Sequence, residues 1–392
     1  MLWPQLRPCH DGRTRAINVV SDSERFGYGI IGCGWVADAH AWGVRALAAE
    51  GAHLVAVADQ DTARAEQLAA RFGNPGLHGD YRELLLRDDI QAVSICLPDF
   101  LHAEAAVAAA QAGKHVLCEK PLALDVPSAD AMVAACAQAG VQLGMMLNHR
   151  YAPDNLLSKA VLRDGGLGEV LIGDCIHSSS LTGDPDNTSP WRGRKGRAAG
   201  GILSTQAIHF LDLLLWFMGR AAAIQAYTAT LVRHEQDYED TVALAIRLKS
   251  GALATLVSTN GSPITDDFTG TRVEIQGSQG YLALVGDRLQ TSNWRPDYKA
   301  PTVSLPAVPD GATEVIFGLG HIYAVMDFVR AVRRGAPAPV PGVDGRHLMA
   351  VVGAAYLSAV EHREVAIPEP HDAYSASPPD PIQMLSARPS AS

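Results

Sequence analysis

The chain of 392 residues has no uninterrupted apolar run near the roughly 20 residues that a membrane-spanning helix needs. Residues 1–25 also lack an apolar stretch that would form the centre of a secretory signal, so we interpret them as a loose extension. Basic side chains are scarce: 32 Lys and Arg stand against 42 Asp and Glu, and the net charge of −10 argues against binding to nucleic-acid phosphates. These absences exclude a membrane span and disfavour a secreted or nucleic-acid-binding protein.

Cysteine occurs at six positions, but never with the paired spacing of a metal site. Cys96 and Cys118 lie in apolar segments, where a thiol behaves as a small hydrophobic group, so the pattern favours a reducing, cytoplasmic compartment. The sequence also lacks a Gly-x-Ser-x-Gly motif, and several histidines are spread along the chain without a close ligand pair: His149, His177, His209, His321 and His347. We therefore expect no metal and no serine nucleophile.

The first part of the chain alternates short apolar runs with amphipathic stretches. The apolar runs cover 28–31, 54–58, 92–97, 115–118 and 142–146. Such runs are typical of buried parallel strands, and the Ala-rich stretches between them, among them 61–72 and 103–112, have the period of helices. The alternation predicts an α/β fold: an N-terminal Rossmann domain over 26–148, with a doubly wound parallel sheet.

The pattern changes after about residue 150, where β-rich segments follow one another. The expected strands cover 169–181, 223–234, 240–249, 252–260, 272–277 and 280–285, and helical patterns return at 204–218, 319–334 and 345–362. Successive strands predict a large, mostly antiparallel open sheet in a C-terminal α+β domain over 149–367. We expect this domain to bind substrate and to form a homodimer or homotetramer through its sheet. Residues 368–392 are rich in Pro, Ser and Ala, and we expect them to be disordered.

A glycine-rich turn joins the first predicted strand to the first predicted helix: Gly32-Cys33-Gly34-Trp35-Val36-Ala37. In this G-x-G-x-x-A pattern the first glycine permits the tight turn, the second lets the backbone approach a pyrophosphate, and the alanine allows close packing. Trp35 and Val36 begin the helix whose positive end would meet the phosphates. Asp59, at the end of the second strand, can accept hydrogen bonds from the ribose hydroxyls of NAD and repels the 2′-phosphate of NADP. The pattern favours NAD, although Arg64 nearby leaves NADP open.

Two further segments extend the pattern beyond a general dinucleotide fold. Residues 97–102 read LPDFLH, and residues 112–122 read AGKHVLCEKPL. With the glycine turn they make the chain similar to the glucose-fructose oxidoreductase and inositol dehydrogenase family (Gfo/Idh/MocA), and Glu119-Lys120-Pro121 is the most specific element. The resemblance covers roughly residues 26–367. It implies NAD(P)-dependent oxidation or reduction of sugars, polyols and related small alcohols by a dimer or tetramer.

The resemblance also implies roles for single residues. It places Lys120 and His209 in catalysis. It adds Leu97, Pro98, His102, Glu119 and Lys120 to the cofactor site, and it implies a substrate site of Lys120, Arg150, Tyr151, Trp191, Arg192, Thr205 and His209. Chemistry supports the catalytic pair, because oxidation of an alcohol needs a base for the hydroxyl proton and a cation near the developing alkoxide. Without the resemblance, Lys120 would be interpreted as a solvated lysine and His209 as a core histidine.

One position departs from the family pattern. Inositol-dehydrogenase-like members carry an Asp four residues before the histidine, where this chain has Thr205, and a hydroxyl cannot provide the charge of a carboxylate. Asp212 shares a helical face with His209, either to orient the imidazole or as an ordinary helix residue. The loop over 191–197 carries four cations, which favour an anionic substrate if they point into the crevice and otherwise form a solvated loop.

The sequence therefore predicts an NAD(P)-dependent oxidoreductase that transfers hydride between the dinucleotide and a sugar, polyol or carboxylated small alcohol. Two alternatives stay open. One is redox-neutral cleavage of a glycoside with tightly held NAD, and the other is a non-catalytic dinucleotide sensor, which Thr205 alone supports. We expect a small-molecule substrate and no nucleic-acid or membrane partner.

Overall fold

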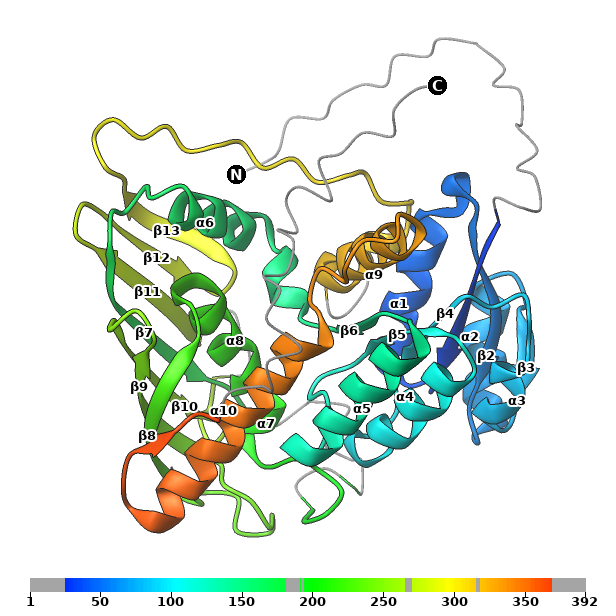
Figure 1. Ribbon diagram of the computed structural model, residues 1–392, viewed down its shortest axis with the longest axis horizontal. Helices are drawn as coiled ribbons and strands as arrows, with labels where there is room; N and C mark the ends of the chain where they lie inside the picture. The colour runs from blue at the N-terminus through cyan, green and yellow to red at the C-terminus, as the bar shows by residue number, and fades with distance from the viewer. Residues whose placement is uncertain (1–24, 181–190, 192–193, 265–269, 315–317, 369–392) are drawn as a thin grey trace.

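The computed structural model describes residues 25–180, 191, 194–264, 270–314 and 318–368. Two sheets form its frame (Figure 1): the blue and cyan ribbon holds the first sheet, and the green and yellow ribbon holds the second. No helix in the described part of the chain is long and apolar enough to pass through a lipid bilayer. The predicted extension over 1–25 and the tail over 368–392 lie almost entirely outside the described residues.

The first sheet has six strands within the described residues, and every neighbouring pair is parallel. The strands are β1 (Phe26–Ile31), β2 (Ala52–Ala58), β3 (Gly76–His78), β4 (Ala92–Ile95), β5 (His115–Cys118) and β6 (Leu143–Met145), in the order β3-β2-β1-β4-β5-β6. Five of them coincide with predicted apolar runs, whereas β3 is too short to give a periodic signal. Because the strand order reverses between β1 and β4, a crevice opens at their carboxyl ends.

The connecting helices of this sheet are α1 (Trp35–Ala46), α2 (Thr62–Arg71), α3 (Tyr81–Leu85), α4 (His102–Gln111) and α5 (Val126–Ala139). Local chemistry explains where they begin and end. The side chain of Asp61 accepts hydrogen bonds from the first turn of α2, and Asp125 does the same for α5. Gly113 follows α4 with a φ of 73°, a conformation in which glycine is favoured.

The second sheet has eight strands in the part of the chain that the structure describes. They are β7 (Val170–Ser178), β8 (Ala221–Ala229), β9 (Thr241–Leu248), β10 (Leu253–Thr259), β11 (Thr271–Gly277), β12 (Tyr281–Val285), β13 (Arg288–Asn293) and β14 (Val365–Ala366), in the order β13-β12-β11-β7-β10-β9-β8-β14. All neighbours are antiparallel except β7 and β10. The predicted mostly antiparallel sheet is confirmed. The polar β13 and the two-residue β14 were not predicted, because neither has an apolar alternation.

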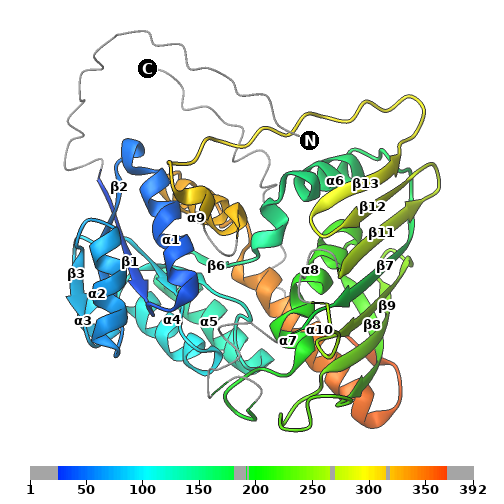
Figure 2. The ribbon, with the colours of Figure 1, turned by 180° about the vertical axis from the view of Figure 1, so that it is seen from behind.

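The remaining helices are α6 (Pro153–Arg163), α7 (Ile202–Thr205), α8 (Ala207–Met218), α9 (Leu319–Arg333) and α10 (Gly342–Glu361). Helix α8 packs on the inner face of the second sheet, against β7 and β10. Helix α9 packs on α1, and α10 packs on α5, β6 and β8 (Figure 2). After building the second sheet, the chain therefore returns to cover the first one.

The single helix predicted over 204–218 is wrong in one respect, because the structure divides it into α7 and α8 at Gln206. In a continuous helix the N–H of His209 would bond to the carbonyl of Thr205. Here it bonds to the carbonyl of Gln206 instead, at 3.1 Å. The break leaves the carbonyl of Thr205 available to another donor.

Candidate active site

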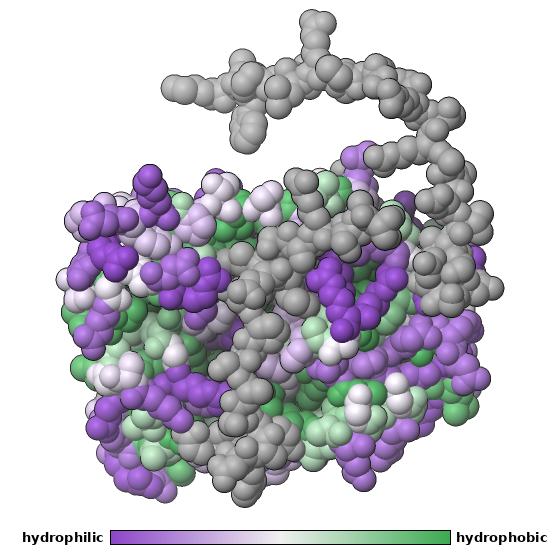
Figure 3. Space-filling model, turned by 45° about the horizontal axis from the view of Figure 1, so that its top comes forward, coloured by the Kyte–Doolittle hydropathy of each residue, from purple (hydrophilic) through white to green (hydrophobic). Residues whose placement is uncertain are grey.

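A cavity of about 1970 Å³ lies between the two sheets, at the carboxyl ends of β1 and β4. Most residues predicted for the site line it: Gly32, Gly34, Trp35, Val36, Asp59, Leu97, Pro98, Glu119, Lys120, Tyr151, Trp191, Thr205 and His209. His102 and Arg150 do not line it, and Arg192 lies outside the described residues. Polar and apolar residues are interspersed over the face in Figure 3.

The glycine turn is shaped for close approach of a ligand to main chain. Gly32 has a φ of 92°, and a Cβ there would lie 2.5 Å from the carbonyl oxygen of Cys96, so this position requires glycine. A Cβ on Gly34 would meet no protein atom within 4 Å, and no side chain caps the start of α1. Open space over uncapped helix amides fits a phosphate group.

Asp59 faces the same part of the cavity and also fixes the turn. Its Oδ2 accepts a hydrogen bond of 2.7 Å from the N–H of Cys33, and its Oδ1 accepts one of 2.8 Å from the N–H of Asp61. These bonds hold the carboxylate at the end of β2, where a ribose next to the turn would lie. The turn, the uncapped helix and this carboxylate together fit a dinucleotide.

His102 has a different position from the one predicted. It is buried, with Nδ1 2.8 Å from the carbonyl oxygen of Pro121 and Nε2 2.8 Å from that of Leu97. The ring thus connects the loops that follow β4 and β5. His102 positions Leu97 and the cis Lys120-Pro121 peptide, instead of lining the cofactor site.

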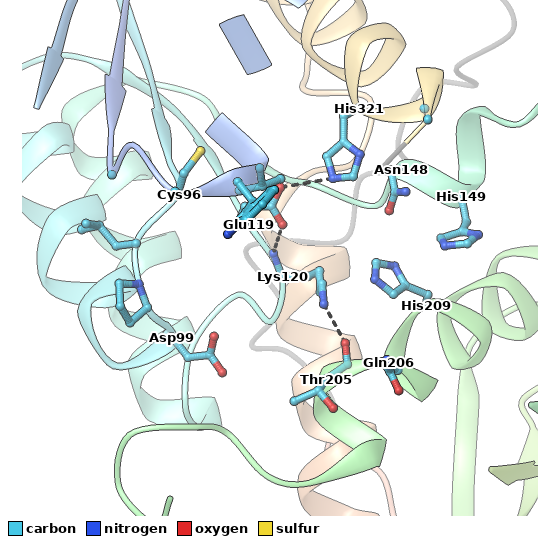
Figure 4. A pocket seen from close by; sticks show the side chains of 18 of the residues that line it. Cys96, Asp99, Glu119, Lys120, Asn148, His149, Thr205, Gln206, His209 and His321 are labelled. Carbon is cyan, nitrogen blue, oxygen red and sulfur yellow. Dashed lines mark hydrogen bonds and ion pairs between the residues drawn. The ribbon is translucent and has the colours of Figure 1, made fainter. Parts of the chain in front are cut away.

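Glu119 belongs to a buried chain of hydrogen bonds. His40 joins its Nε2 to Glu119 at 3.0 Å and its Nδ1 to Ser94 at 2.6 Å, and Tyr28 continues the chain to Ser94 at 2.8 Å. His321 lies 3.5 Å from the same carboxylate oxygen (Figure 4). Burial raises the pKa of Glu119, but His321 and His40 outweigh it and hold this pKa well below its ordinary value. Glu119 is therefore a fixed negative charge beside Lys120.

Lys120, in the loop after β5, extends across the cavity to the end of α7. Its Nζ donates a hydrogen bond of 2.6 Å to the carbonyl oxygen of Thr205, which the break between α7 and α8 leaves available (Figure 4). The hydroxyl of Thr205 donates to the carbonyl of Gly201 at 2.8 Å. Thr205 thus contributes its main chain to the site, and its side chain is engaged within α7.

His209 lies between Lys120 and His149 (Figure 4). Its Nδ1 is buried and has no hydrogen-bond partner among the described residues. Burial, together with the positive charge of Lys120 and the nearby His149, lowers the pKa of His209 well below its ordinary value. The imidazole is therefore neutral at pH 7 and able to accept a proton.

Arg150 and Asp212 form a buried ion pair, which corrects two expectations. Arg150 Nε and Nη2 donate to the two oxygens of Asp212 at 2.8 and 2.6 Å, and Asp344 lies 3.6 Å from Nη1. Arg150 therefore joins the turn before α6 to α8 and α10 instead of binding substrate. Asp212 is engaged by this guanidinium and does not orient His209. Tyr151 lines the cavity, but its hydroxyl donates to Asp327 at 3.0 Å.

The cationic loop gives little support to an anionic substrate. Arg194, Lys195 and Arg197 are exposed and do not line the cavity. Arg194 lies 4.0 Å from the carboxylate of Asp237, and Arg197 stacks over the ring of Phe100. In the described part of this loop, only Trp191 faces the cavity.

Metal and thiolate chemistry find no support in the described part of the chain. It contains no group of three or more His, Cys, Asp or Glu placed to hold a metal ion. Five cysteines are free and buried: Cys33, Cys96, Cys118, Cys136 and Cys175. Burial raises the pKa of the Cys96 and Cys118 thiols well above their ordinary value, so both stay protonated.

Sequence reasoning missed several groups that the fold brings into the cavity: Asn148, His149, Gln206, Asp287 and His321. His149 and His209 are 60 positions apart in sequence, yet their ring centroids are 4.8 Å apart. The expectation that the histidines are scattered therefore holds along the chain but not in space. No local motif predicts these contacts, because each depends on how the two sheets are placed relative to one another.

Comparison with known proteins agrees with this geometry. A model of an oxidoreductase family with an NAD-binding Rossmann fold matches residues 26–147, and a Gfo/Idh/MocA C-terminal domain matches residues 156–283. The chain belongs to the Gfo/Idh/MocA family. The predicted family, fold class and enzyme class are thereby confirmed.

Similar proteins match over most of their length. The chain is 30% identical to D-apiose dehydrogenase of Paraburkholderia graminis, over 90% of this chain and 94% of that one. It is 25% identical to levoglucosan dehydrogenase of Pseudarthrobacter phenanthrenivorans, over 87% and 98%. A solved structure of levoglucosan dehydrogenase in complex with NADH and levoglucosan has a TM-score of 0.77 at 26% identity, covering 88% of this chain and 99% of that chain. The likeness thus includes both sheets and the cavity between them.

Proposed function

We propose that this protein is an NAD-dependent dehydrogenase of a sugar or polyol, with carboxylated small alcohols as the next substrate class. The observation that carries the proposal is that Lys120, in the loop after β5, and His209, on α8, lie in one cavity that also holds the glycine turn. Similar proteins are named for their action on levoglucosan and D-apiose. Their substrates are rich in hydroxyl groups, as the proposed substrate is.

The dinucleotide would be held by the turn at Gly34, the first amides of α1 and the carboxylate of Asp59. When bound, it accepts a hydride from the substrate carbon or returns one. Asp59 favours NAD over NADP, because its carboxylate repels a 2′-phosphate. Arg64, the candidate partner for that phosphate, pairs with Asp61 at 3.2 Å.

The proton chemistry falls to Lys120 and His209. Lys120 donates a hydrogen bond to the substrate oxygen and stabilises the negative charge that develops there. His209 is neutral and accepts the hydroxyl proton directly or from Lys120. The carbonyl of Thr205 orients Lys120 Nζ during this exchange.

The lining of the substrate half favours an uncharged, hydroxyl-rich ligand. Asn148 and Gln206 contribute amides, Trp191 an indole, and His149 an imidazole. Amides and imidazoles can both donate and accept hydrogen bonds, which suits hydroxyl groups. The described cations of the 191–197 loop lie outside the cavity. We therefore rank carboxylated substrates after uncharged sugars and polyols.

The test is turnover with NAD, and separately with NADP, across sugars, polyols and sugar acids, followed by the absorbance of reduced nicotinamide. We expect NADH to accumulate, and Lys120→Met to lower kcat by about 1000-fold with NAD affinity unchanged. Lys249→Met, which removes an exposed lysine outside the cavity, is the matched control. Full activity of Lys120→Met would refute the assignment. Product without net NADH would favour redox-neutral cleavage, and NAD binding without turnover would favour a sensor.

We further propose that the outer face of the second sheet binds a second copy of the chain. Register places Ile176 beside Val257, then Ala243, then Tyr227, in one row across four strands. Ile176, Val257 and Tyr227 are exposed although apolar, which is typical of an interface. Val257→Lys should therefore reduce the mass measured by light scattering. Leu86→Lys, an exposed apolar residue on the first domain, should leave that mass unchanged.

A further inference from the structure

His149 and Asp287 form a second pair of acid–base groups in the cavity, and the proposed function gives them no part in proton transfer. His149 Nδ1 lies 2.9 Å from Asp287 Oδ1, and both residues line the cavity. They come from distant parts of the chain: His149 precedes α6, and Asp287 lies in the two-residue turn between β12 and β13. Neither the glycine turn nor the Glu119-Lys120-Pro121 motif includes them.

One buried amide fixes both partners. Asn155 Nδ2 donates to Asp287 Oδ1 and to the main-chain oxygen of His149, each at 2.8 Å. Asn155 is fully buried, so this double contact has little freedom to relax. The turn that carries Asp287 is held as well, because the N–H of Leu289 donates to Asp154 Oδ2 at 2.9 Å. The carboxylate is therefore pre-oriented toward the imidazole.

The direction of the hydrogen bond between His149 and Asp287 follows from the chemistry of the carboxylate. An ionised carboxylate only accepts hydrogen bonds, so the Nδ1 of His149 carries the proton that it donates to Asp287. The lone pair of the neutral ring is then on Nε2, which has no hydrogen-bond partner among the described residues. A ring held in this tautomer is ready to take up a proton at Nε2, and the carboxylate stabilises the imidazolium that results.

The neighbour of this ring is His209. The two ring centroids are 4.8 Å apart, which places their edges in contact, and the buried Nδ1 of His209 has no hydrogen-bond partner in the described part of the chain. Thr205, whose hydroxyl is bonded to Gly201, cannot give His209 a carboxylate. His209 therefore adjoins one fixed imidazole–carboxylate pair and one lysine.

Other ionisable groups surround His149 on the elements packed against its turn. His209 lies on α8, His321 on α9, Asp154 on α6 and His177 on β7. Among the described residues, only Asp287 is hydrogen-bonded to the imidazole of His149. Asp287 is therefore the group that fixes the orientation and the tautomer of this ring.

We infer that His149 is the proton relay of the substrate half. Asp287 is the residue that orients its ring and stabilises the imidazolium. This inference rests on the proposed function. In the oxidation, the substrate C–H hydrogen and its electron pair leave as hydride to the oxidised nicotinamide. The hydroxyl proton passes to His209, either directly or by a relay in which Lys120 gives one of its own protons to His209 and takes up the hydroxyl proton. The proton then passes to Nε2 of His149, and from the imidazolium to water. Reduction of the carbonyl runs the same proton path in reverse.

The first test uses steady-state kinetics of the full-length protein. We expect His149→Gln to lower kcat about 100-fold and Asp287→Asn about tenfold, with KM within about threefold. The double variant should be no slower than His149→Gln, because the two residues act as one unit. Added imidazole should restore part of the activity of His149→Gly and none of that of His149→Gln. Additive losses without imidazole rescue would overturn the relay.

A matched variant separates the relay from the shape of the turn. Asp154→Asn weakens the contact that holds the β12–β13 turn but keeps the carboxylate of Asp287. We expect Asp287→Asn to lower kcat at least tenfold more than Asp154→Asn does. Equal losses would mean that Asp287 only holds the turn, and would overturn the inference.

A second readout does not depend on turnover. In ¹⁵N-histidine spectra, the neutral ring of His149 should carry its proton on Nδ1, which donates to Asp287. Asp287→Ala, which removes this acceptor, should shift the ring toward the Nε2–H tautomer, whereas Asp154→Ala should leave the tautomer unchanged. A tautomer that Asp287→Ala does not alter would overturn the inference even if the enzyme is active. If no substrate in the panel is turned over but the tautomer changes as expected, the proposed function fails and the His149–Asp287 pair stands.

Discussion

The dinucleotide half of the cavity is built mostly from main chain, whereas the substrate half is built from side chains. On one side, Gly32 and Gly34 expose backbone, and Asp59 is the one side chain that we assign to the cofactor's ribose. On the other side, Lys120, His149 and His209 converge from three separate elements. The first half therefore depends on backbone conformation, and the second depends on buried charge and tautomer.

This difference indicates which substitutions each half of the cavity tolerates poorly. A main-chain site tolerates changes in side chains but not in backbone torsion. A site of buried ionisable groups tolerates neither the loss of a partner nor the gain of a proton. The following predictions test the two vulnerabilities separately, starting with the largest effect.

Removal of a buried partner should have the largest effect on stability. Asp212→Ala leaves the guanidinium of Arg150 buried with only Asp344 nearby, so we expect the free energy of unfolding to fall by about 3 to 5 kcal/mol. Urea unfolding measures this change. Asp130→Ala is the control, because Asp130 pairs with Arg346 but is half-exposed, and its loss should cost about 1 kcal/mol or less. Equal costs would remove the distinction between the two kinds of pair.

Acid should weaken the packing of the second sheet through the buried His177 on β7. Burial lowers the pKa of His177 to about 4, so between pH 6.5 and 4 the unfolded chain binds a proton there that the folded chain does not. The stabilisation is complete above pH 6.5 and is lost as the pH falls, by about 2 kcal/mol at pH 5. We expect His177→Gln to reduce the difference between urea unfolding at pH 7 and pH 5. An unchanged difference would show that His177 is not responsible.

The backbone requirement of the dinucleotide half gives an effect of similar size. Gly32→Ala should lower the free energy of unfolding by about 2 kcal/mol, because an alanine resists the positive φ and meets the Cys96 carbonyl. Gly34→Ala is its counterpart: it should leave stability within about 0.5 kcal/mol but weaken NADH binding in a fluorescence titration. The comparison fails if both variants lose stability equally, since Gly34 has no strained torsion.

The smallest effect concerns the single carboxylate of that half. Asp59→Asn removes the charge that repels a 2′-phosphate, so the preference for NAD over NADP should fall by about tenfold, or roughly 1.4 kcal/mol. The dissociation constants of the two cofactors measure this preference. Glu66→Gln, which removes an exposed charge of α2 outside the cavity, should leave the preference unchanged. An unaltered preference in Asp59→Asn would mean that another residue selects between the two cofactors.

The main-chain half was predictable from sequence because its determinants are local. The turn from Gly32 to Ala37 and the carboxylate of Asp59 follow directly from strand ends, and apolar runs mark those ends. Helix and strand periods also indicated both sheets, although not the polar β13. Local signals fix such elements because neighbours in the sequence are neighbours in space.

The side-chain half was only partly predictable. Lys120 and His209 were identified through a family resemblance, and the structure places both in the cavity. The interruption at Gln206, the Arg150–Asp212 pair and the His149–Asp287 pair were missed or misassigned. The two pairs each join residues at least 60 positions apart, and no periodicity in the sequence reports such a contact.

The return of α9 and α10 to the first sheet has a consequence for biosynthesis. The ribosome completes β6 188 residues before it completes α9, which packs on α1, and 216 residues before it completes α10, which packs on α5. Domains tend to fold as they emerge, so the first sheet forms while part of its apolar covering is still unmade. The nascent chain therefore carries exposed apolar surface on α1 and α5 for most of translation, and this interval is when it is most exposed to aggregation.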